Sequence, residues 1–91
     1  MMNYKESELQ TIEELAALFF KPSEIAIVLE INDEEFVAEI KLEEGEAYRR
    51  YKKGWLTSEI ELRKSVFESA TNGSNPAQNM MLDYNKNNRY A

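Results

Sequence analysis

The sequence predicts an all-α protein, with a small trihelical unit followed by one long helix and one short C-terminal helix. Three observations lead to this prediction. Apolar residues recur at spacings of three and four, which is the period of an amphipathic helix. Residues that cap or break helices separate these segments. No segment carries a strong strand or hairpin signal; the run IAIV at residues 25–28 would also suit a short strand, but helix signals flank it.

The first helix is expected over residues 11–20. Thr11 and Glu14 match a capping box, and Lys21-Pro22 ends the pattern. Residues 1–8 are polar and are expected to be frayed. The apolar face of this helix consists of Ile12, Leu15, Ala16, Leu18 and Phe19.

The next two helices are expected over residues 24–30 and 34–42, with Ser23 and Asp33 as their caps. The junction between them is short, and its Asn32 can adopt a left-handed conformation. Small Ala26 lets the two helices cross closely, and Val37 anchors the second against the first. This arrangement is typical of a helix-turn-helix, which usually binds nucleic acid.

The long helix is expected over residues 46–71, after a hinge at Gly45. Gly54 lies inside it, where glycine marks a kink or close packing. The segment TNGSN ends the helix, Pro76 begins the last one, and residues 85–91 form a tail. We therefore divide the chain into a helix-turn-helix-like unit at 1–44 and a part at 45–91, which packs as one domain or serves oligomerisation.

Composition argues against an enzyme. The 91 residues include no cysteine and no histidine, so disulfides, thiolate sites and the usual general base are excluded. Glu30, Asp33, Glu34 and Glu35 could collect magnesium, but no shaped loop or converging element is visible. We expect no catalytic residue, no metal site and no cofactor.

Charge is unevenly distributed along the chain. Residues 1–44 hold three lysines against twelve acidic residues, whereas residues 45–91 hold eight basic residues against five acidic ones. Such asymmetry suits nucleic-acid contact by the basic part, or head-to-tail packing of subunits, or simply two solvated faces.

The segment YRRYKKGW at 48–55 interleaves cations with aromatic residues, which suits nucleic acid because cations neutralise phosphate and aromatic rings stack on bases. The aromatic residues share one helix face, which is more typical of a core or an interface. A solvated helix face paired with Glu59 and Glu68 is the alternative. The predicted DNA-binding residues are Arg49, Arg50, Lys52, Lys53, Arg63 and Lys64. The predicted oligomer interface consists of Tyr51, Trp55, Leu62 and Val66.

The expected reading helix carries four acidic residues, Asp33, Glu34, Glu35 and Glu39. Carboxylates repel phosphate, and only Lys41 offers a cation there. Either the long helix supplies the phosphate contacts, or the acidic front docks on a basic protein partner such as the rear of a neighbouring copy.

The segment AYRRYKKGWLTSEIELRKSVFESATNGSNPAQNMMLDY resembles the small terminase subunits of tailed phages and prophages. The preceding PSEIAIVLEINDEEF resembles the helix-turn-helix that these proteins carry upstream. The resemblance implies a non-enzymatic DNA-packaging recognition protein that forms rings through central helices and delivers DNA to a large terminase motor subunit. The acidic reading helix and the short chain depart from that family pattern.

We therefore expect a homo-oligomeric DNA-binding protein of the host-cell cytoplasm, without membrane contact. The alternatives are an acidic protein-interaction module and a helix-turn-helix transcriptional regulator, which would form dimers on a palindromic site.

Overall fold

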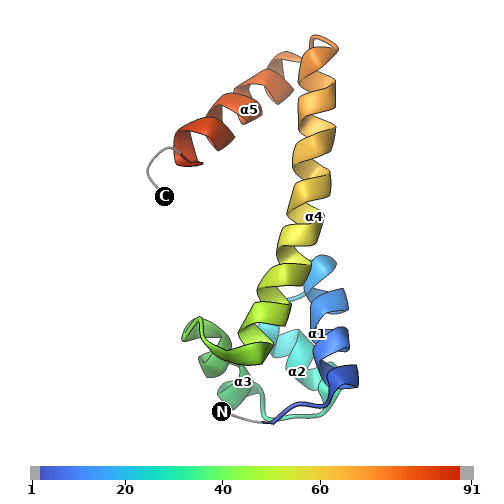
Figure 1. The fold of residues 1–91 in the computed structure, drawn as a ribbon, viewed down its shortest axis with the longest axis vertical. Coiled ribbons are helices and arrows are strands. Elements are labelled where there is room, and N and C mark those ends of the chain that lie inside the picture. The colour runs from blue at the N-terminus through green and yellow to red at the C-terminus, as the bar shows by residue number, and fades with distance from the viewer. Residues whose placement is uncertain (1–2, 89–91) are drawn as a thin grey trace. The chain divides into compact units, whose positions relative to one another are not determined.

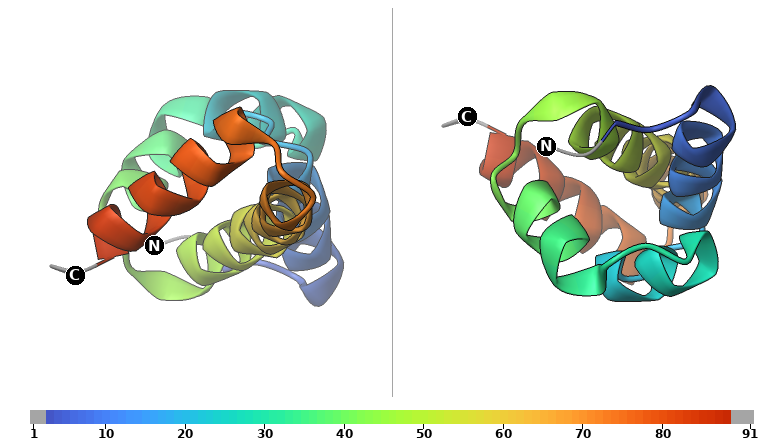
Figure 2. Two further views of the ribbon diagram at one scale, coloured as in Figure 1. Left: turned by 90° about the horizontal axis from the view of Figure 1, so that it is seen from above. Right: turned by 90° about the horizontal axis from the view of Figure 1, so that it is seen from below.

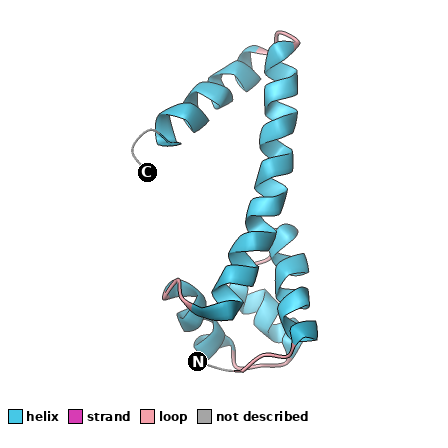
Figure 3. Ribbon diagram, in the orientation of Figure 1, coloured by secondary structure: helices cyan, strands magenta, loops and turns pink. Residues whose placement is uncertain are grey.

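The structure is a computed structural model, and it describes residues 3–88. These residues form five helices and no strand, so the predicted all-α class is confirmed (Figure 1, Figure 3). The helices are α1 (Glu6–Ala17), α2 (Pro22–Leu29), α3 (Asp33–Lys41), α4 (Gly45–Thr71) and α5 (Asn75–Asn88).

The chain divides into two compact units, and the boundary lies inside α4. The first unit ends at Ser58 and the second begins at Glu59. We expected the division at residues 44 and 45 instead. The first turns of α4 belong with α1 to α3 because Ala47 is fully buried in their common core.

The core of the first unit is contributed by four helices. Helix α2 packs against both α1 and α3, and the right-hand view of Figure 2 shows these helices and the start of α4 around one centre. Phe36, Ile12 and Ile25 are its largest fully buried side chains, each worth about 1.5–3 kcal/mol of burial. The complete buried set is Leu9, Ile12, Ala16, Ile25, Ala26, Phe36, Ile40 and Ala47.

Helix α1 begins five residues earlier than we predicted. The amide of Lys5 donates to the carboxylate of Glu8 at 2.8 Å, which satisfies a donor at the helix start. Thr11 does not cap the helix, because its hydroxyl donates to the carbonyl of Ser7 inside the helix. The early start brings Leu9 into the core.

The starts of α2 and α3 also differ from the predicted caps by one or two residues. Lys21 precedes α2, and its amide donates to the Glu24 carboxylate at 2.9 Å. The side chain of Asn32, rather than Asp33, accepts from the amide of Glu35 at 2.9 Å. Asn32 therefore acts as the N-cap of α3 rather than as the left-handed residue of the turn.

The left-handed residues stand where α1, α2 and α3 end. Phe19, Glu30 and Glu43 have φ angles of 64°, 58° and 57°, a region that glycine adopts with least strain. At Glu30 the turn is closed by the amide of Ile31, which donates to the carbonyl of Ala26 at 3.1 Å. At the end of each of these three helices, a residue other than glycine therefore adopts a backbone conformation that is unfavourable by about 1 kcal/mol or more.

Helix α4 lies close against the backbone of α1 at Gly54. A Cβ atom at this position would lie 2.0 Å from the carbonyl oxygen of Glu13. One turn further on, the hydroxyl of Ser58 donates to the carbonyl of Ala17. The sequence suggested either a kink or close packing as the reason for Gly54. The contact with Glu13 shows that the reason is close packing.

The second unit contains the end of α4, a turn at Gly73 and α5. Its buried residues are Val66, Ala70 and Ala77, with Met81 and Tyr84 packed against them. Helix α5 begins at Asn75 and continues to Asn88, so most of the tail that we expected at 85–91 is helical; residues 89–91 lie outside the described part.

Candidate nucleic-acid interface

Three of the predicted DNA-binding residues lie on one exposed face of α4 in the first unit. Arg49, Lys52 and Lys53 are spaced at i, i+3 and i+4, and all three side chains are exposed. The ammonium of Lys52 lies 5.0 Å from the centre of the Trp55 ring. The ammonium of Lys53 lies 3.7 Å from the Glu13 carboxylate, a loose surface pair worth at most about 1 kcal/mol. We call these three residues the α4 basic face.

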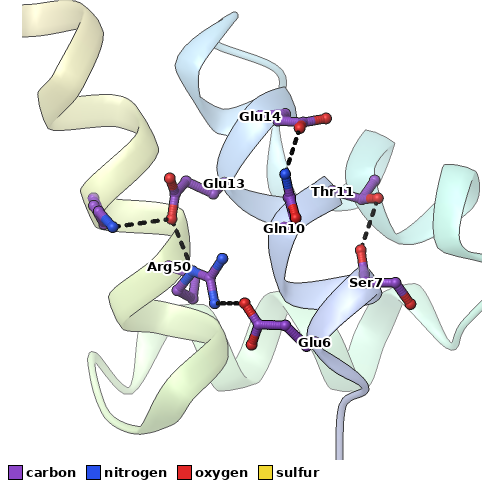
Figure 4. Close-up of polar contacts among 8 residues, drawn as sticks. Glu6, Ser7, Gln10, Thr11, Glu13, Glu14 and Arg50 are labelled. Carbon is purple, nitrogen blue, oxygen red and sulfur yellow. Dashed lines mark hydrogen bonds and ion pairs between the residues drawn. The ribbon is translucent and has the colours of Figure 1, made fainter.

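Arg50 has a different role. Its guanidinium lies 2.8 Å from the carboxylate of Glu6 and 2.8 Å from that of Glu13, and its side chain is 24% exposed. Figure 4 shows Arg50 reaching from α4 to the carboxylates of Glu6 and Glu13 on α1. The hydrogen bonds to Glu6 and Glu13 raise the pKa of Arg50 above its usual value. Arg50 therefore holds α4 against α1 and does not belong to the α4 basic face.

Arg63 and Lys64 lie in the second unit and are paired within their own helix. Arg63 contacts the Glu59 carboxylate at 3.1 Å and lies 4.2 Å above the ring centre of Tyr84. Lys64 contacts Glu61 at 3.6 Å. These two residues therefore fit the alternative that we considered, a solvated helix face whose cations pair with nearby carboxylates. The partners are Glu59, as expected, and Glu61 instead of Glu68.

Most of the predicted oligomer interface packs inside the monomer. Tyr51 lies against the core of the first unit, where burial raises the pKa of its phenol. Trp55 meets Phe19 edge-on, with ring centres 5.7 Å apart. Val66 is buried in the second unit, whereas Leu62 is 45% exposed. Of the four residues, Leu62 is the most available to another subunit.

The second unit exposes a larger apolar surface than sequence reasoning assigned to it. Besides Leu62, the large apolar side chains that are exposed on its two helices are Ile60, Phe67, Met80 and Leu82. A hairpin whose buried residues are one valine and two alanines leaves most of its apolar area in water. The angular positions of Ile60 and Phe67 on α4, about a quarter turn to one side of Val66 and Ala70, would have indicated this surface.

The four acidic residues of α3 fall into two groups. Glu39 is only 6% exposed and accepts a hydrogen bond of 2.6 Å from the hydroxyl of Tyr4, so it fastens the N-terminal segment to α3. Asp33, Glu34 and Glu35 are exposed, and no ion pair among the described residues includes any of them. The exposed surface of α3 is therefore acidic, as predicted.

Comparison with known protein families, with curated proteins and with solved structures found no match to this chain. Within residues 3–88, no helix combines the length and the apolar character that crossing a membrane requires. The described part of the chain also contains no group of three or more acidic side chains arranged to hold a metal ion.

Proposed function

We propose that this protein is a non-enzymatic DNA-binding protein whose phosphate contacts come from the α4 basic face. The observation that supports the proposal is the placement of Arg49, Lys52 and Lys53, three exposed cations within two turns of one helix. Only Lys53 has a carboxylate within 4 Å among the described residues, and that pair is weak enough to exchange for phosphate.

The basic face is carried by a firmly held part of α4. Arg50, Gly54 and Ser58 all fix this part of the helix to α1. Cations on a fixed helix lose less conformational freedom on binding than cations on a loop. Contacts of this kind position a protein on the DNA backbone and carry little sequence information.

This arrangement separates DNA contact from the helix that would read bases in a helix-turn-helix. The exposed acidic residues of α3 would repel phosphate, whereas the first turns of α4 present cations. A protein that works in this way would show a modest preference among DNA sequences, unlike a helix-turn-helix regulator with a palindromic site.

We further propose that copies of the chain associate through the exposed apolar residues of the second unit. The small buried set of that unit and the exposure of Ile60, Leu62 and Phe67 support this association. Several copies on one DNA molecule would combine weak individual contacts into useful affinity. The resemblance to small terminase subunits extends the proposal to DNA packaging, with a large terminase motor subunit as the protein partner.

The proposal is tested by the binding of a fluorescent 20-base-pair duplex, measured by anisotropy at about 50 mM salt. The variant Arg49→Ala/Lys52→Ala/Lys53→Ala is compared with Lys5→Ala/Lys21→Ala/Lys86→Ala, which removes the same charge from exposed sites elsewhere. We expect about a tenfold or greater loss of affinity in the first variant and little change in the second. Equal losses in both variants, or no binding by the unaltered chain, would refute the proposal.

A further inference from the structure

The outward face of α3 is hollowed into a shallow groove. Its lining residues are Asp33, Glu34, Val37, Ala38 and Lys41. They form two rows along the helix, with Asp33, Val37 and Lys41 in one and Glu34 and Ala38 in the other. Side chains four residues apart form the ridges that pack into grooves of a neighbouring helix, and a small residue such as alanine permits close approach. The hollow between these two rows could therefore take up a ridge of side chains from another helix.

The charges along this groove run from negative to positive. Asp33 and Glu34 lie at the beginning of α3, Lys41 lies at its end, and Val37 and Ala38 lie between them. Among the described residues, none of the three charged side chains forms an ion pair. A helix with the same pattern, laid antiparallel, would bring opposite charges together at both ends and apolar side chains together at the centre.

We propose that this second helix is α3 of another copy of the chain. In such a pair, Lys41 lies beside Asp33 of the partner subunit and Glu34 of the partner subunit, and the two-fold axis passes near Ala38. An interface of this kind is self-complementary because each copy contributes the same surface.

The contact spans only about two helical turns, so it is weak by itself and depends on protein concentration. In this pair, Asp33 and Glu34 bind a lysine of the other copy instead of contacting DNA. It uses no residue of the α4 basic face and does not depend on DNA binding or on the apolar surface of the second unit.

The absence of cysteine from the sequence allows a direct crosslinking test. The variant Ala38→Cys places one thiol near the proposed axis, and Ser7→Cys places one at an exposed position on α1 as the control. With oxidised glutathione and no DNA, we expect Ala38→Cys to form disulfide-linked dimers at least about tenfold faster than Ser7→Cys. Equal rates for the two variants would overturn the proposal.

Charge reversal tests the antiparallel orientation in the Ala38→Cys background. Lys41→Glu, or Asp33→Lys together with Glu34→Lys, should each slow crosslinking several-fold. An equimolar mixture of these two proteins should restore the rate, since each then offers the other a complementary groove. All of these positions are exposed, and helix content by circular dichroism confirms that the variants fold.

Three results would contradict the proposal. Unchanged rates after charge reversal would mean that the groove charges do not meet in pairs. A mixture as slow as its components would exclude the antiparallel arrangement. Faster crosslinking of the Asp33→Lys/Glu34→Lys protein by itself would show that repulsion between acidic faces dominates, so that α3 serves a basic partner of another sequence.

Discussion

Gly54→Ala is expected to destabilise the first unit, although alanine is the better helix former. The new Cβ would lie 2.0 Å from the oxygen and 2.8 Å from the carbon of the Glu13 carbonyl. An ordinary contact is about 3.4 Å, so α1 and α4 must separate by roughly 1.4 Å at this point. The obstacle is backbone and cannot rotate away as a side chain would.

The size of the effect follows from two opposing contributions. Helix propensity favours alanine by about 1 kcal/mol. Overpacking against backbone costs about 3 kcal/mol, at the upper end of its usual range. The net loss of about 2 kcal/mol is a large part of the roughly 3–9 kcal/mol expected for a unit of this size. It corresponds to a decrease in Tm of about 8–16 °C.

Urea unfolding followed by tryptophan fluorescence is the appropriate assay. Trp55 is the single tryptophan and contacts Phe19 of the first unit, so its emission reports on this unit. Thr57→Ala serves as the control, because Thr57 is exposed and its hydroxyl bonds only to the carbonyl of Lys53 in its own helix. It should be neutral or slightly stabilising. If Gly54→Ala also proves as stable as the unaltered chain, the close approach of α4 to α1 is refuted.

Two further predictions concern the first unit. Tyr4→Phe should lower the free energy of unfolding by about 1–3 kcal/mol near neutral pH, because Glu39 stays buried without its hydrogen-bond donor. Burial and the neighbouring Glu39 raise the pKa of Tyr4, so the stability that the Tyr4 hydroxyl contributes is complete below about pH 10 and is lost as the pH rises further. The urea midpoints of the two proteins should therefore differ less at pH 11 than at pH 7. A difference that is the same at both pH values would contradict this account. Glu30→Gly should stabilise by about 0.5–1 kcal/mol, because glycine adopts the left-handed φ of 58° without strain. Glu34→Gly, inside α3, should instead destabilise by about 1 kcal/mol, and thermal melts that show the same sign for both would refute the argument.

The helical class and the five segments could be predicted because they depend on local periodicity. The starts of α1 and α2 could not, since each begins after a lysine whose side chain forms no cap. Instead, Glu8 and Glu24 reach back to the preceding amides, and the sequence also offered Thr11 and Ser23 as plausible caps. When two possible caps are equally good in the local sequence, the start that buries more apolar side chains is favoured. At α1 the earlier start buries Leu9.

The residues of the α4 basic face could be predicted because their position around the helix determines whether their side chains are exposed. Arg49, Lys52 and Lys53 share the outer face of α4, and a helical projection places them there. Arg50 points the other way, toward Ala47 and Gly54, but its partners Glu6 and Glu13 lie about 40 residues away in sequence. Spacing within one segment carries no information about such distant partners, so Arg50 was counted among the DNA contacts.

The most direct test of the central claim is the dependence of DNA affinity on salt. Each phosphate contact contributes about 0.9 to the slope of log affinity against log salt concentration. If the α4 basic face makes three contacts, replacing Arg49, Lys52 and Lys53 with alanine should reduce the slope by about 2.7, whereas Arg50→Gln should change it little while lowering stability. A slope that is the same with and without these three cations would contradict the account.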